Sequence, residues 1–504
     1  MALLVGTDIG TLGAKTVVVD CEGRVHGEAF QEYDVLTPAQ GWAEQWPNPW
    51  ERAVYHTIRE AVKATGAPTD EFQGLCISGL YGGSGIPVDK DYKPLRPCLI
   101  WADRRATQEC EWVEETIGVD RIYQVTGNVV DPYYGYAKIL WLKNNEPKTW
   151  EKIHRLETPN GYVIRRLTGV ENIDHTSAGN LGGVYDLEKR CWSEELMEEM
   201  GIPRSFFPEE ILESVEVVGE LSGEAASKLG IPKGTQVCAG GIDAPISALA
   251  GGATKSGDLV AMLGTSMCNG VINREEKYSP QMINYPYALN PSKTIYSFTG
   301  ISTAGFCVRW FRDQLSRDLA GLGVENPYKV LDEEAAKVAP GSEGLIFLPH
   351  MMVGERAPYW DNHLKGGLLG LTVYHTRGHL FRAVLEGVAY AMRYSIEAAL
   401  ETGIHLGRAT LVGGGASSSL WRQILADVTG VQFNYLPESM GAPLGDAFLA
   451  GLATGNISSE NQIEKWVAGM EPIPPSQETR ETYNKGYHNY LNDLKHLKPF
   501  FSLL

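Results

Sequence analysis

The sequence lacks any long apolar run, and its first residues lack the basic segment of a secretory signal. No apolar stretch approaches the roughly 20 residues that a membrane helix needs. Residues 1–5 (Met-Ala-Leu-Leu-Val) are apolar with no cationic residues before them, which predicts a first strand and not a signal peptide. We therefore expect a cytoplasmic protein with no membrane partner.

Positive charge is also scarce. The 44 Lys and Arg residues stand against 62 Asp and Glu residues, for a formal net charge of −18. A surface of this sign repels phosphate backbones and anionic lipid, so no nucleic-acid partner is expected. Small anions can still be held locally by backbone N–H groups together with a magnesium ion.

Close cysteine spacings are absent as well. No Cys-x-x-Cys occurs, and no cysteine lies near a histidine at the spacing of a zinc site. A long chain of this kind is expected to keep its cysteines as reduced, buried thiols. The eight cysteines are at positions 21, 76, 98, 110, 191, 238, 268 and 307.

What is present is an ordinary globular composition in a long chain. Hydrophobic residues make up 43% of the 504 residues, with 12 Trp and 23 Tyr among them. This composition excludes disordered, collagen-like and coiled-coil classes. At roughly 150 residues per domain, the length predicts two to four domains.

The first eighty residues predict an antiparallel meander that leads into a helix and a further strand. Short β-branched or apolar runs alternate with turns rich in Gly and Asp, and an amphipathic pattern of helical period follows. The expected elements are strands at 3–7, 15–20 and 25–33, a helix at 49–65 and a strand at 74–78.

The same order of strand, Gly-Thr turn and strand recurs past the middle, which predicts two domains of one architecture. The recurring strands are expected at 257–263 and 267–272, with a third at 294–298. Gly and Ala are dense at 248–253. We place the boundary there and expect domains at 1–250 and 251–504.

The last third predicts long helices around one buried strand. Residues 379–402 have a long helical pattern, 409–412 form a strand, and Ser419 is expected to cap a helix that Gly430 ends. Strands that alternate with helices after antiparallel meanders are typical of an α/β chain with mixed sheets.

Three turns rich in Gly, Thr and Ser are candidate phosphate contacts, at 10–13, 264–266 and 413–418. Glycine lets the backbone approach a phosphate, and Thr or Ser adds a hydroxyl donor. Such turns also join ordinary strands, and none of the three matches a P-loop or a dinucleotide fingerprint. Together they favour one nucleotide held between two domains.

Two aspartates follow strands at positions suited to chemistry. Asp8 ends the first strand inside the first turn, where a carboxylate can hold Mg²⁺; the alternative is a local Asp turn. Asp243 follows the strand before 244–249, where a carboxylate can take a proton from a substrate hydroxyl. The alternative for Asp243 is a helix cap, and the two interpretations are compatible.

A third segment, Trp101-Ala-Asp103-Arg-Arg, has the residue types of a sugar site. Aromatic faces pack on sugar C–H surfaces, and a carboxylate with a guanidinium fixes hydroxyls. The alternative is an Asp–Arg surface pair beside a core tryptophan.

These pieces in this order resemble the FGGY carbohydrate kinase family over nearly the whole chain, from Asp8 to about Gly451. The segment 133–145 is similar to the first family signature, except that Gly135 stands where Ser, Thr or Pro is usual. The segment 366–386 is similar to the second signature without departure. The resemblance implies two ribonuclease-H-like (actin-like) domains with the active site in the cleft between them.

The resemblance also implies roles for individual positions. Asp243 matches the catalytic base and Asp8 the metal-associated carboxylate. The cofactors implied are ATP and Mg²⁺, and the family's frequent dimers imply a homodimer. The positions matched to nucleotide contacts are Gly10, Thr11, Lys15, Gly264, Thr265, Gly305, Gly414, Gly415 and Ser418, and those matched to substrate contacts are Tyr81, Trp101, Asp103, Tyr133 and Asp243.

The substrate side departs from the better-known members. Residues 79–84 (Gly-Leu-Tyr-Gly-Gly-Ser) contain neither the sugar-binding His of xylulokinases nor the Arg-Glu pair of glycerol kinases, whereas Trp101 and Tyr133 are similar to the glycerol-kinase versions. We predict an ATP-dependent kinase acting on a primary hydroxyl of a small sugar or polyol, with a pentulose as the first choice and glycerol or a tetritol as the alternative. An actin-like ATPase and a catalytically reduced regulatory relative are the competing classes.

Overall fold

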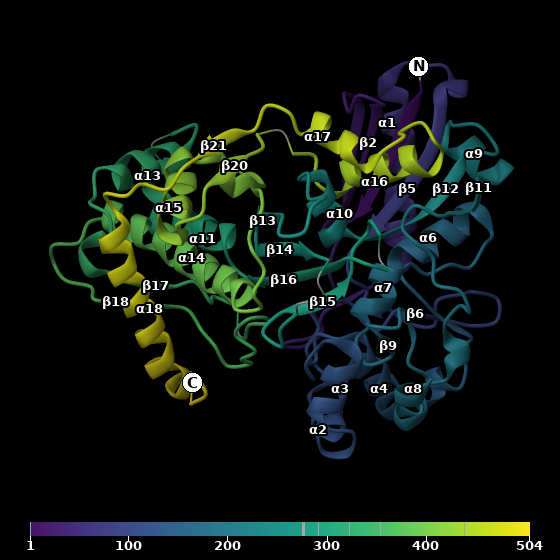
Figure 1. Cartoon of the computed structure of the whole chain (residues 1–504), viewed down its shortest axis with the longest axis horizontal. Coiled ribbons are helices and arrows are strands. Elements are labelled where there is room, and N and C mark those ends of the chain that lie inside the picture. The colour runs from purple at the N-terminus through teal and green to yellow at the C-terminus, as the bar shows by residue number, and fades with distance from the viewer. Residues whose placement is uncertain are drawn as a thin grey trace. The chain divides into compact units, whose positions relative to one another are not determined.

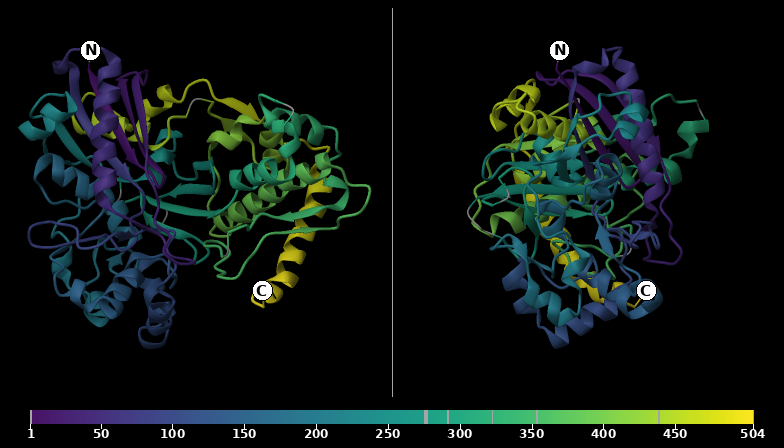
Figure 2. Two further views of the ribbon diagram at one scale, coloured as in Figure 1. Left: turned by 180° about the vertical axis from the view of Figure 1, so that it is seen from behind. Right: turned by 90° about the vertical axis from the view of Figure 1, so that its right-hand side faces the viewer.

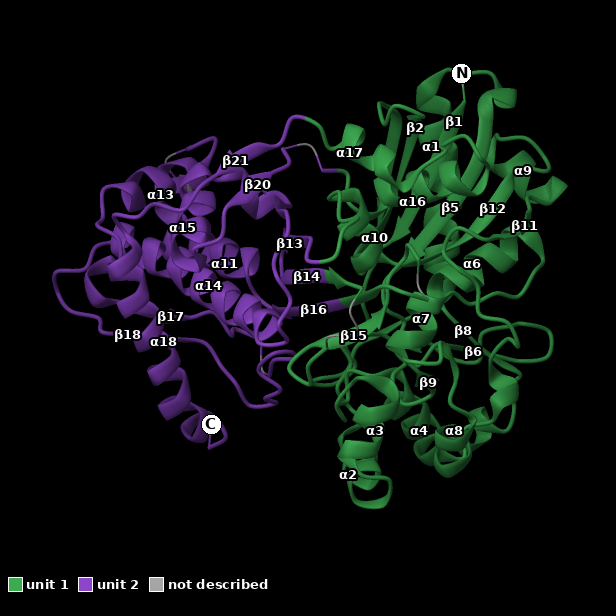
Figure 3. Ribbon diagram, in the orientation of Figure 1, with its two compact units in different colours: residues 1–256, 272–296, 440–468 green, residues 257–271, 297–439, 469–504 purple. Residues whose placement is uncertain are grey.

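The computed structural model describes residues 2–274, 278–290, 292–321, 323–352, 354–437 and 439–503. The chain forms two compact units, drawn in green and purple in Figure 3. Unit 1 comprises residues 1–256, 272–296 and 440–468, and unit 2 comprises residues 257–271, 297–439 and 469–504. Each unit is therefore assembled from three separate segments of the chain.

Unit 1 is built on a six-stranded mixed sheet (Figure 1). β1 runs antiparallel to β2 and parallel to β5, and β5 runs parallel to β12. The strands, in their order across the sheet, are β11 (Val217–Glu220), β12 (Gln236–Ile242), β5 (Phe72–Gly79), β1 (Leu3–Ile9), β2 (Gly13–Asp20) and β3 (Val25–Glu32).

Helices cover both faces of this sheet. α1 (Pro47–Thr65) and α16 (Ala442–Ala453) lie on opposite sides of it, as the right-hand view of Figure 2 shows. The alternation along β1 explains this, because side chains of a strand point to opposite faces in turn. Leu3 and Val5 are buried in the core that contains α1. Gly6 faces α16 so closely that a Cβ would lie 1.9 Å from the Pro443 carbonyl oxygen.

Unit 2 repeats the arrangement around β1. β13 runs antiparallel to β14 and parallel to β19, as β1 does to β2 and β5. The helices α13 (Pro327–Ala336), α14 (Arg377–Leu400) and α15 (Ser419–Thr429) pack against one another beside this sheet. Its strands, in order, are β16 (Ile295–Ile301), β14 (Met267–Asn273), β13 (Leu259–Leu263), β19 (Ala409–Val412), β20 (Phe433–Tyr435) and β21 (Glu471–Ile473). The strand β15 (Ile283–Pro286) belongs to unit 1.

Shorter elements complete the two units. In unit 1 these are β4 (Glu44–Gln45), β6 (Ile86–Val88), β7 (Cys98–Leu99), α2 (Thr107–Thr116), α3 (Val119–Thr126), α4 (Gly135–Asn145), α5 (Pro147–Trp150), β8 (Arg155–Glu157), α6 (Pro159–Thr168), α7 (His175–Asn180), β9 (Tyr185–Asp186), β10 (Cys191–Trp192), α8 (Glu194–Met200), α9 (Gly223–Leu229), α10 (Asp243–Ala250) and α17 (Ile463–Trp466). In unit 2 they are α11 (Gly305–Leu315), α12 (Arg317–Gly321), β17 (Ile346–Leu348), β18 (Gly367–Leu369) and α18 (Arg480–Phe501).

The sequence predicted the α/β class, the mixed sheets and both meanders correctly, and two local predictions need correction. Ser418, not Ser419, caps α15: its Oγ accepts a hydrogen bond of 3.1 Å from the Trp421 N–H. Not all the cysteines are buried: Cys191 is exposed, and Cys21 and Cys268 are partly exposed. Within the described ranges, no helix is both long enough and apolar enough to span a membrane.

Candidate functional site

Three neighbouring strands of unit 1 end at one level of the sheet. Ile9 of β1 pairs with Gly79 of β5, and Gly79 pairs with Ile242 of β12. Because parallel strands place their carboxyl ends at one edge, the residues there come together. Asp8 is the penultimate residue of β1, and Asp243 directly follows β12. The fold therefore brings both predicted carboxylates to the same edge.

Asp8 is a partly buried carboxyl group beside a second carboxyl group, Asp243. Burial and the negative charge of Asp243 raise the pKa of Asp8 to about 8. Two contacts act in the opposite direction: the Ser78 hydroxyl donates to Oδ1 over 3.2 Å, and Lys15 contributes its positive charge. A carboxyl pair of this kind gains from a cation, which favours the charged form of both groups.

Asp446 is a third acid at this edge that the sequence analysis did not find. It lies on α16 with no exposed surface, and its Oδ2 accepts from the Ser78 hydroxyl over 2.6 Å. Burial raises the pKa of Asp446 well above its usual value, so this group is kept as a neutral acid. The one signal available was an isolated acid within the otherwise apolar helix 442–453.

Asp243 is aimed by an irregularity in β12. Gly240 has a φ of +63°, and a Cβ there would lie 2.1 Å from the Ile77 carbonyl oxygen, so only glycine fits. Asp243 is the first residue of α10, and Ile242 takes the N-cap position.

The first Gly-Thr turn is attached to the predicted sugar side. The Trp101 indole N–H donates to Thr11 Oγ1 over 3.0 Å, and the Tyr33 hydroxyl donates to the Gly10 carbonyl over 2.5 Å. Lys15 lies one strand away, with its ammonium 3.7 Å from Glu28. Gly10, Thr11 and Trp101 are therefore held as one cluster, a proximity that the sequence did not predict.

Tyr81 and Tyr133 extend this cluster. Both are buried, with ring centroids 5.1 Å apart, and the Tyr81 carbonyl accepts from the Trp101 N–H over 3.1 Å. The Tyr133 hydroxyl accepts from Asn180 Nδ2 over 3.2 Å. Lys138 of α4 fixes the loop by donating to the Pro132 and Tyr133 carbonyls, each over 2.6 Å.

Asp103 does not fit the predicted substrate contact, and this is a correction. Its side chain is fully buried, and its two oxygens accept from the Ala43 N–H and from Arg105 over 2.7–3.1 Å. A carboxylate whose lone pairs are used in this way has no face for a sugar hydroxyl. The pair is a buried structural one and not the surface pair of the alternative interpretation.

The second Gly-Thr turn lies in unit 2 and is fixed by the start of α11. The backbone N–H groups of Ala304 and Phe306 donate to the Thr265 carbonyl, over 2.9 and 3.1 Å. The Gly305 N–H donates to the Gly264 carbonyl over 3.0 Å. A Cβ on Gly305 would lie 2.5 Å from that carbonyl oxygen, so the close approach requires glycine.

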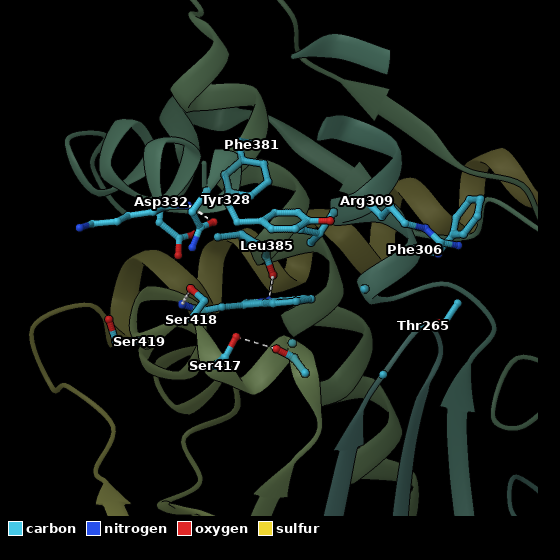
Figure 4. A pocket seen from close by; sticks show the side chains of 18 residues that line it. Thr265, Phe306, Arg309, Tyr328, Asp332, Phe381, Leu385, Ser417, Ser418 and Ser419 are labelled. Carbon is cyan, nitrogen blue, oxygen red and sulfur yellow. Dashed lines mark hydrogen bonds between the residues drawn. The ribbon is translucent and has the colours of Figure 1, made fainter. Parts of the chain in front are cut away.

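A cavity of about 560 Å³ opens beside this turn, within unit 2 (Figure 4). Its walls combine aromatic rings with glycine and serine loops. All six residues predicted in this half of the chain line it: Gly264, Thr265, Gly305, Gly414, Gly415 and Ser418.

The sequence missed most of the cavity wall. The missed rings are Phe306, Tyr328, Phe381 and Trp421, and the missed polar groups include Arg309, Asn326 and Asp332. Burial raises the pKa of Asp332, and its hydrogen bond with Ser418 acts in the opposite direction. Tyr328 and Asp332 stand four positions apart on α13 and face the cavity together, which is the signal that the sequence offered.

Aromatic walls beside glycine-rich loops suit a nucleotide. Flat rings pack against a base, and glycine backbones approach phosphates. For a metal ion the donors are fewer: in the part of the chain that the structure describes, no cluster of three or more His, Cys, Asp or Glu side chains is arranged to hold one. Asp8 and Asp243 remain as a pair.

Comparison with known proteins gives one consistent answer. Residues 3–250 match the N-terminal domain of the FGGY family of carbohydrate kinases, and residues 259–454 match its C-terminal domain. The xylulose kinase of Bacillus subtilis (strain 168) is 28% identical, over 100% of this chain and 99% of the relative. The gluconokinase of the same strain is 29% identical, over 95% and 93%. The crystal structure of xylulose kinase from Rhodospirillum rubrum has a TM-score of 0.86 at 27% identity, and covers 99% of this chain and 100% of that one.

Proposed function

Because the chain belongs to the FGGY family of carbohydrate kinases, which use ATP, we propose that it transfers the γ-phosphoryl group of ATP to a primary hydroxyl of a pentulose. The observation that carries the proposal is the carboxyl edge of unit 1, where Asp8 and Asp243 interact beside Trp101, Tyr81 and Tyr133.

Asp243 is proposed as the general base. A carboxylate at the strand end can accept the proton of the attacking hydroxyl as the bond to phosphorus forms. The negative charge of Asp243 is, after burial, the second cause that raises the pKa of Asp8. Asp243 needs to be ionised to accept a proton.

Asp8, with Asp243, is proposed to hold Mg²⁺. The donor set fits, because Mg²⁺ is bound through one or two carboxylates together with substrate phosphates and water. The raised pKa of Asp8 marks a carboxyl group whose charge Lys15 alone does not compensate. When bound, the ion neutralises charge on the transferring phosphoryl group.

The cavity of unit 2 is proposed as the ATP site. Phe306, Tyr328 and Trp421 offer faces for the base, and Gly414 and Gly415 offer open backbone beside it. Thr265 offers a hydroxyl donor for phosphate. Gly10, Thr11 and Lys15 are proposed to contact phosphate from unit 1, where the Thr11 hydroxyl already accepts from Trp101 and remains able to donate.

The proposed acceptor is D-xylulose or a similar ketose. Full-length relatives named xylulose kinase support this choice. In this chain the side chains of Trp101, Tyr81 and Tyr133 can offer a substrate ring faces and hydroxyl groups, and none of the three side chains is itself charged. Such a wall suits a neutral sugar better than gluconate, the acid acted on by the other named relatives.

A coupled ADP-release assay tests the proposal. The purified chain is given saturating Mg-ATP with a panel containing D-xylulose, D-ribulose, erythritol, glycerol and gluconate, and one sample without acceptor. We expect D-xylulose or another pentulose to give the largest kcat/KM. ATP hydrolysis that no acceptor increases would support an actin-like ATPase instead, and a tenfold preference for glycerol or gluconate would contradict the assigned acceptor. Sedimentation of the same sample tests the proposed homodimer.

A further inference from the structure

We propose that Glu355 is a positioning residue for the Gly264–Thr265 turn, and that His350 and Tyr490 hold its carboxylate in place from the C-terminal helix α18. This inference rests on the proposed nucleotide role of that turn. All the groups involved belong to unit 2.

Glu355 joins two parts of unit 2 through a buried carboxylate. Its side chain is 1% exposed. Oε2 accepts from both the backbone N–H and the hydroxyl of Ser302, each over 2.9 Å, and Oε1 lies 3.1 Å from His350 Nδ1. A buried carboxylate is costly unless its hydrogen bonds are made, so this geometry fixes Ser302 firmly.

A relay of rings continues from Glu355 to the C-terminal helix. His350 is fully buried, and its Nε2 lies 3.2 Å from the Tyr490 hydroxyl. Tyr490 in turn lies 2.9 Å from the Tyr359 hydroxyl. Burial raises the pKa of both tyrosines, so each keeps its proton and can donate.

One set of proton positions satisfies the whole relay. Tyr359 donates to Tyr490, Tyr490 donates to His350 Nε2, and His350 Nδ1–H donates to Glu355. Every hydroxyl and ring nitrogen then has a partner. The relay therefore orients the Glu355 carboxylate toward Ser302.

Ser302 connects this relay to the turn. One residue, Thr303, separates it from 304–306, whose N–H groups donate to the carbonyls of Gly264 and Thr265. Thr303 is also held, since its hydroxyl donates to the Pro349 carbonyl. Releasing Ser302 would loosen one end of the segment on which the turn rests.

The chain contains a matched control in Glu386. This glutamate is also 1% exposed, and it also accepts from a serine hydroxyl and a backbone N–H: Ser342 over 2.7 Å and Gly341 over 2.9 Å. It contacts α18 directly, by accepting from the Tyr483 hydroxyl over 3.1 Å, whereas Glu355 contacts α18 through His350. Arg382 completes its contacts. Glu386 holds residues 341–342 and not the Gly264–Thr265 turn. Its substitution therefore tests whether the loss of any buried glutamate in unit 2 weakens ATP binding.

The experiment measures ATP affinity by calorimetry without acceptor, and the KM values for ATP and for the best acceptor. We expect Glu355→Ala to weaken ATP binding and raise its KM by about tenfold or more, with the acceptor KM within twofold of the wild-type value. Glu355→Gln should stay within about threefold, because its amide oxygen can accept from Ser302 and its NH₂ can donate to the other tautomer of His350. Glu386→Ala should lose comparable thermal stability without an ATP-selective effect.

Two milder single variants are used in case Glu355→Ala does not fold: Tyr490→Phe is the test, and Tyr483→Phe is its control. The first should raise the ATP KM about two- to fivefold, and the second should not. The inference is overturned if Glu355→Ala binds ATP as the wild type does, if both KM values rise together, or if the Glu386 variant shows the same ATP-selective loss. Thr265→Val serves as the reference. If Thr265→Val leaves ATP affinity unchanged, the proposed role of the turn itself is wrong. If Thr265→Val weakens ATP binding but the Glu355 variants do not, only the inference about Glu355 is wrong.

Discussion

Three acids and one lysine share the carboxyl edge of unit 1, and their environments differ. Asp446 is kept neutral by burial, and Asp8 is shifted to a pKa of about 8. Asp243 starts a helix whose first-turn N–H groups favour a negative charge. Neighbouring carboxyl groups with separated pKa values can take separate roles, one as base and one as partner to a cation.

Asp243→Asn tests the assigned base. The change keeps the size of the side chain and removes the proton acceptor, so kcat should fall by about two to four orders of magnitude. ATP affinity, measured by calorimetry, should remain near the wild-type value. A variant with nearly full turnover would show that Asp243 has only a structural place at the start of α10.

Asp8→Asn should change the pH dependence of stability in the metal-free protein. The folded pKa of about 8 lies above the unfolded value of 3.8, so the free energy of unfolding falls as pH rises from about 4 to 8 and levels off above that. The amide cannot ionise and avoids this loss. The Tm of the variant relative to the wild type should therefore be higher at pH 9 than at pH 5, by at least about 2 °C.

The exposed Asp91 provides the control for this experiment. Asp91→Asn should give the same Tm offset at both pH values. A constant offset for Asp8→Asn as well would contradict the assigned pKa of Asp8. Adding Mg-ATP to both proteins should reduce the advantage of the variant, since the cation favours the charged carboxylate of the wild type.

At the scale of elements, the start of α4 fits closely under the turn that contains Tyr81. Gly135 opens this helix, and a Cβ there would lie 2.3 Å from the Gly83 carbonyl oxygen and 2.9 Å from the Tyr81 hydroxyl. Gly135 and the segment 79–84, which contains Tyr81, are places where the sequence analysis found departures from the better-known family members. A side chain at Gly135 would meet the Tyr81 hydroxyl, so the ring and the glycine fit together.

Gly135→Ala is therefore expected to strain this contact. Overpacking of a buried site should cost about 1–3 kcal/mol in the free energy of unfolding, read from urea denaturation. The acceptor KM should rise while the ATP KM stays constant. Gly223→Ala at the start of α9 is the control, since its Cβ would meet no atom closer than 3.7 Å. Equal stability of the two variants would contradict the close contact.

Local elements were predictable from the sequence, and long-range contacts were not. The strands around Asp8 and Thr265 follow from periodicity and turn residues that lie next to one another in the chain. Asp446 and Ser78 are 368 positions apart, so no local pattern connects them. Trp421 shows a second limit: helical spacing shows that a ring is inward, but not whether it faces a core or a cavity. Asp103 shows a third, because a short polar motif does not reveal burial.

At the scale of the whole molecule, the compact units do not follow a single cut in the chain. The match to the N-terminal family domain ends at residue 250, and the match to the C-terminal family domain begins at residue 259. The domain boundary at 250 remains a prediction. Unit 1 also includes 440–468, which supplies α16. α16 covers one face of β1 and β5 and brings Asp446 to Ser78, so that segment belongs to the core of unit 1 and not to an appendage.

A fragment of residues 1–296 should therefore not fold stably, because one face of its sheet lacks α16. The same fragment joined to 440–468 by a flexible linker should be folded. Circular dichroism measures the folding of the two fragments, and sedimentation measures whether each is monomeric. The control is the 1–296 fragment that carries the linker without residues 440–468. A stable, monomeric 1–296 fragment would show that α16 is dispensable for unit 1.

The distance in sequence between β1 and α16 has a consequence for synthesis on the ribosome. β1 ends at Ile9 and α16 begins at Ala442, so the first strand waits for more than 400 further residues before its second covering layer exists. At about 5–20 residues per second, this wait lasts roughly 20–90 seconds. The close-fitting face marked by Gly6 stays open throughout that time. The nascent chain therefore presents an incomplete sheet for most of its translation.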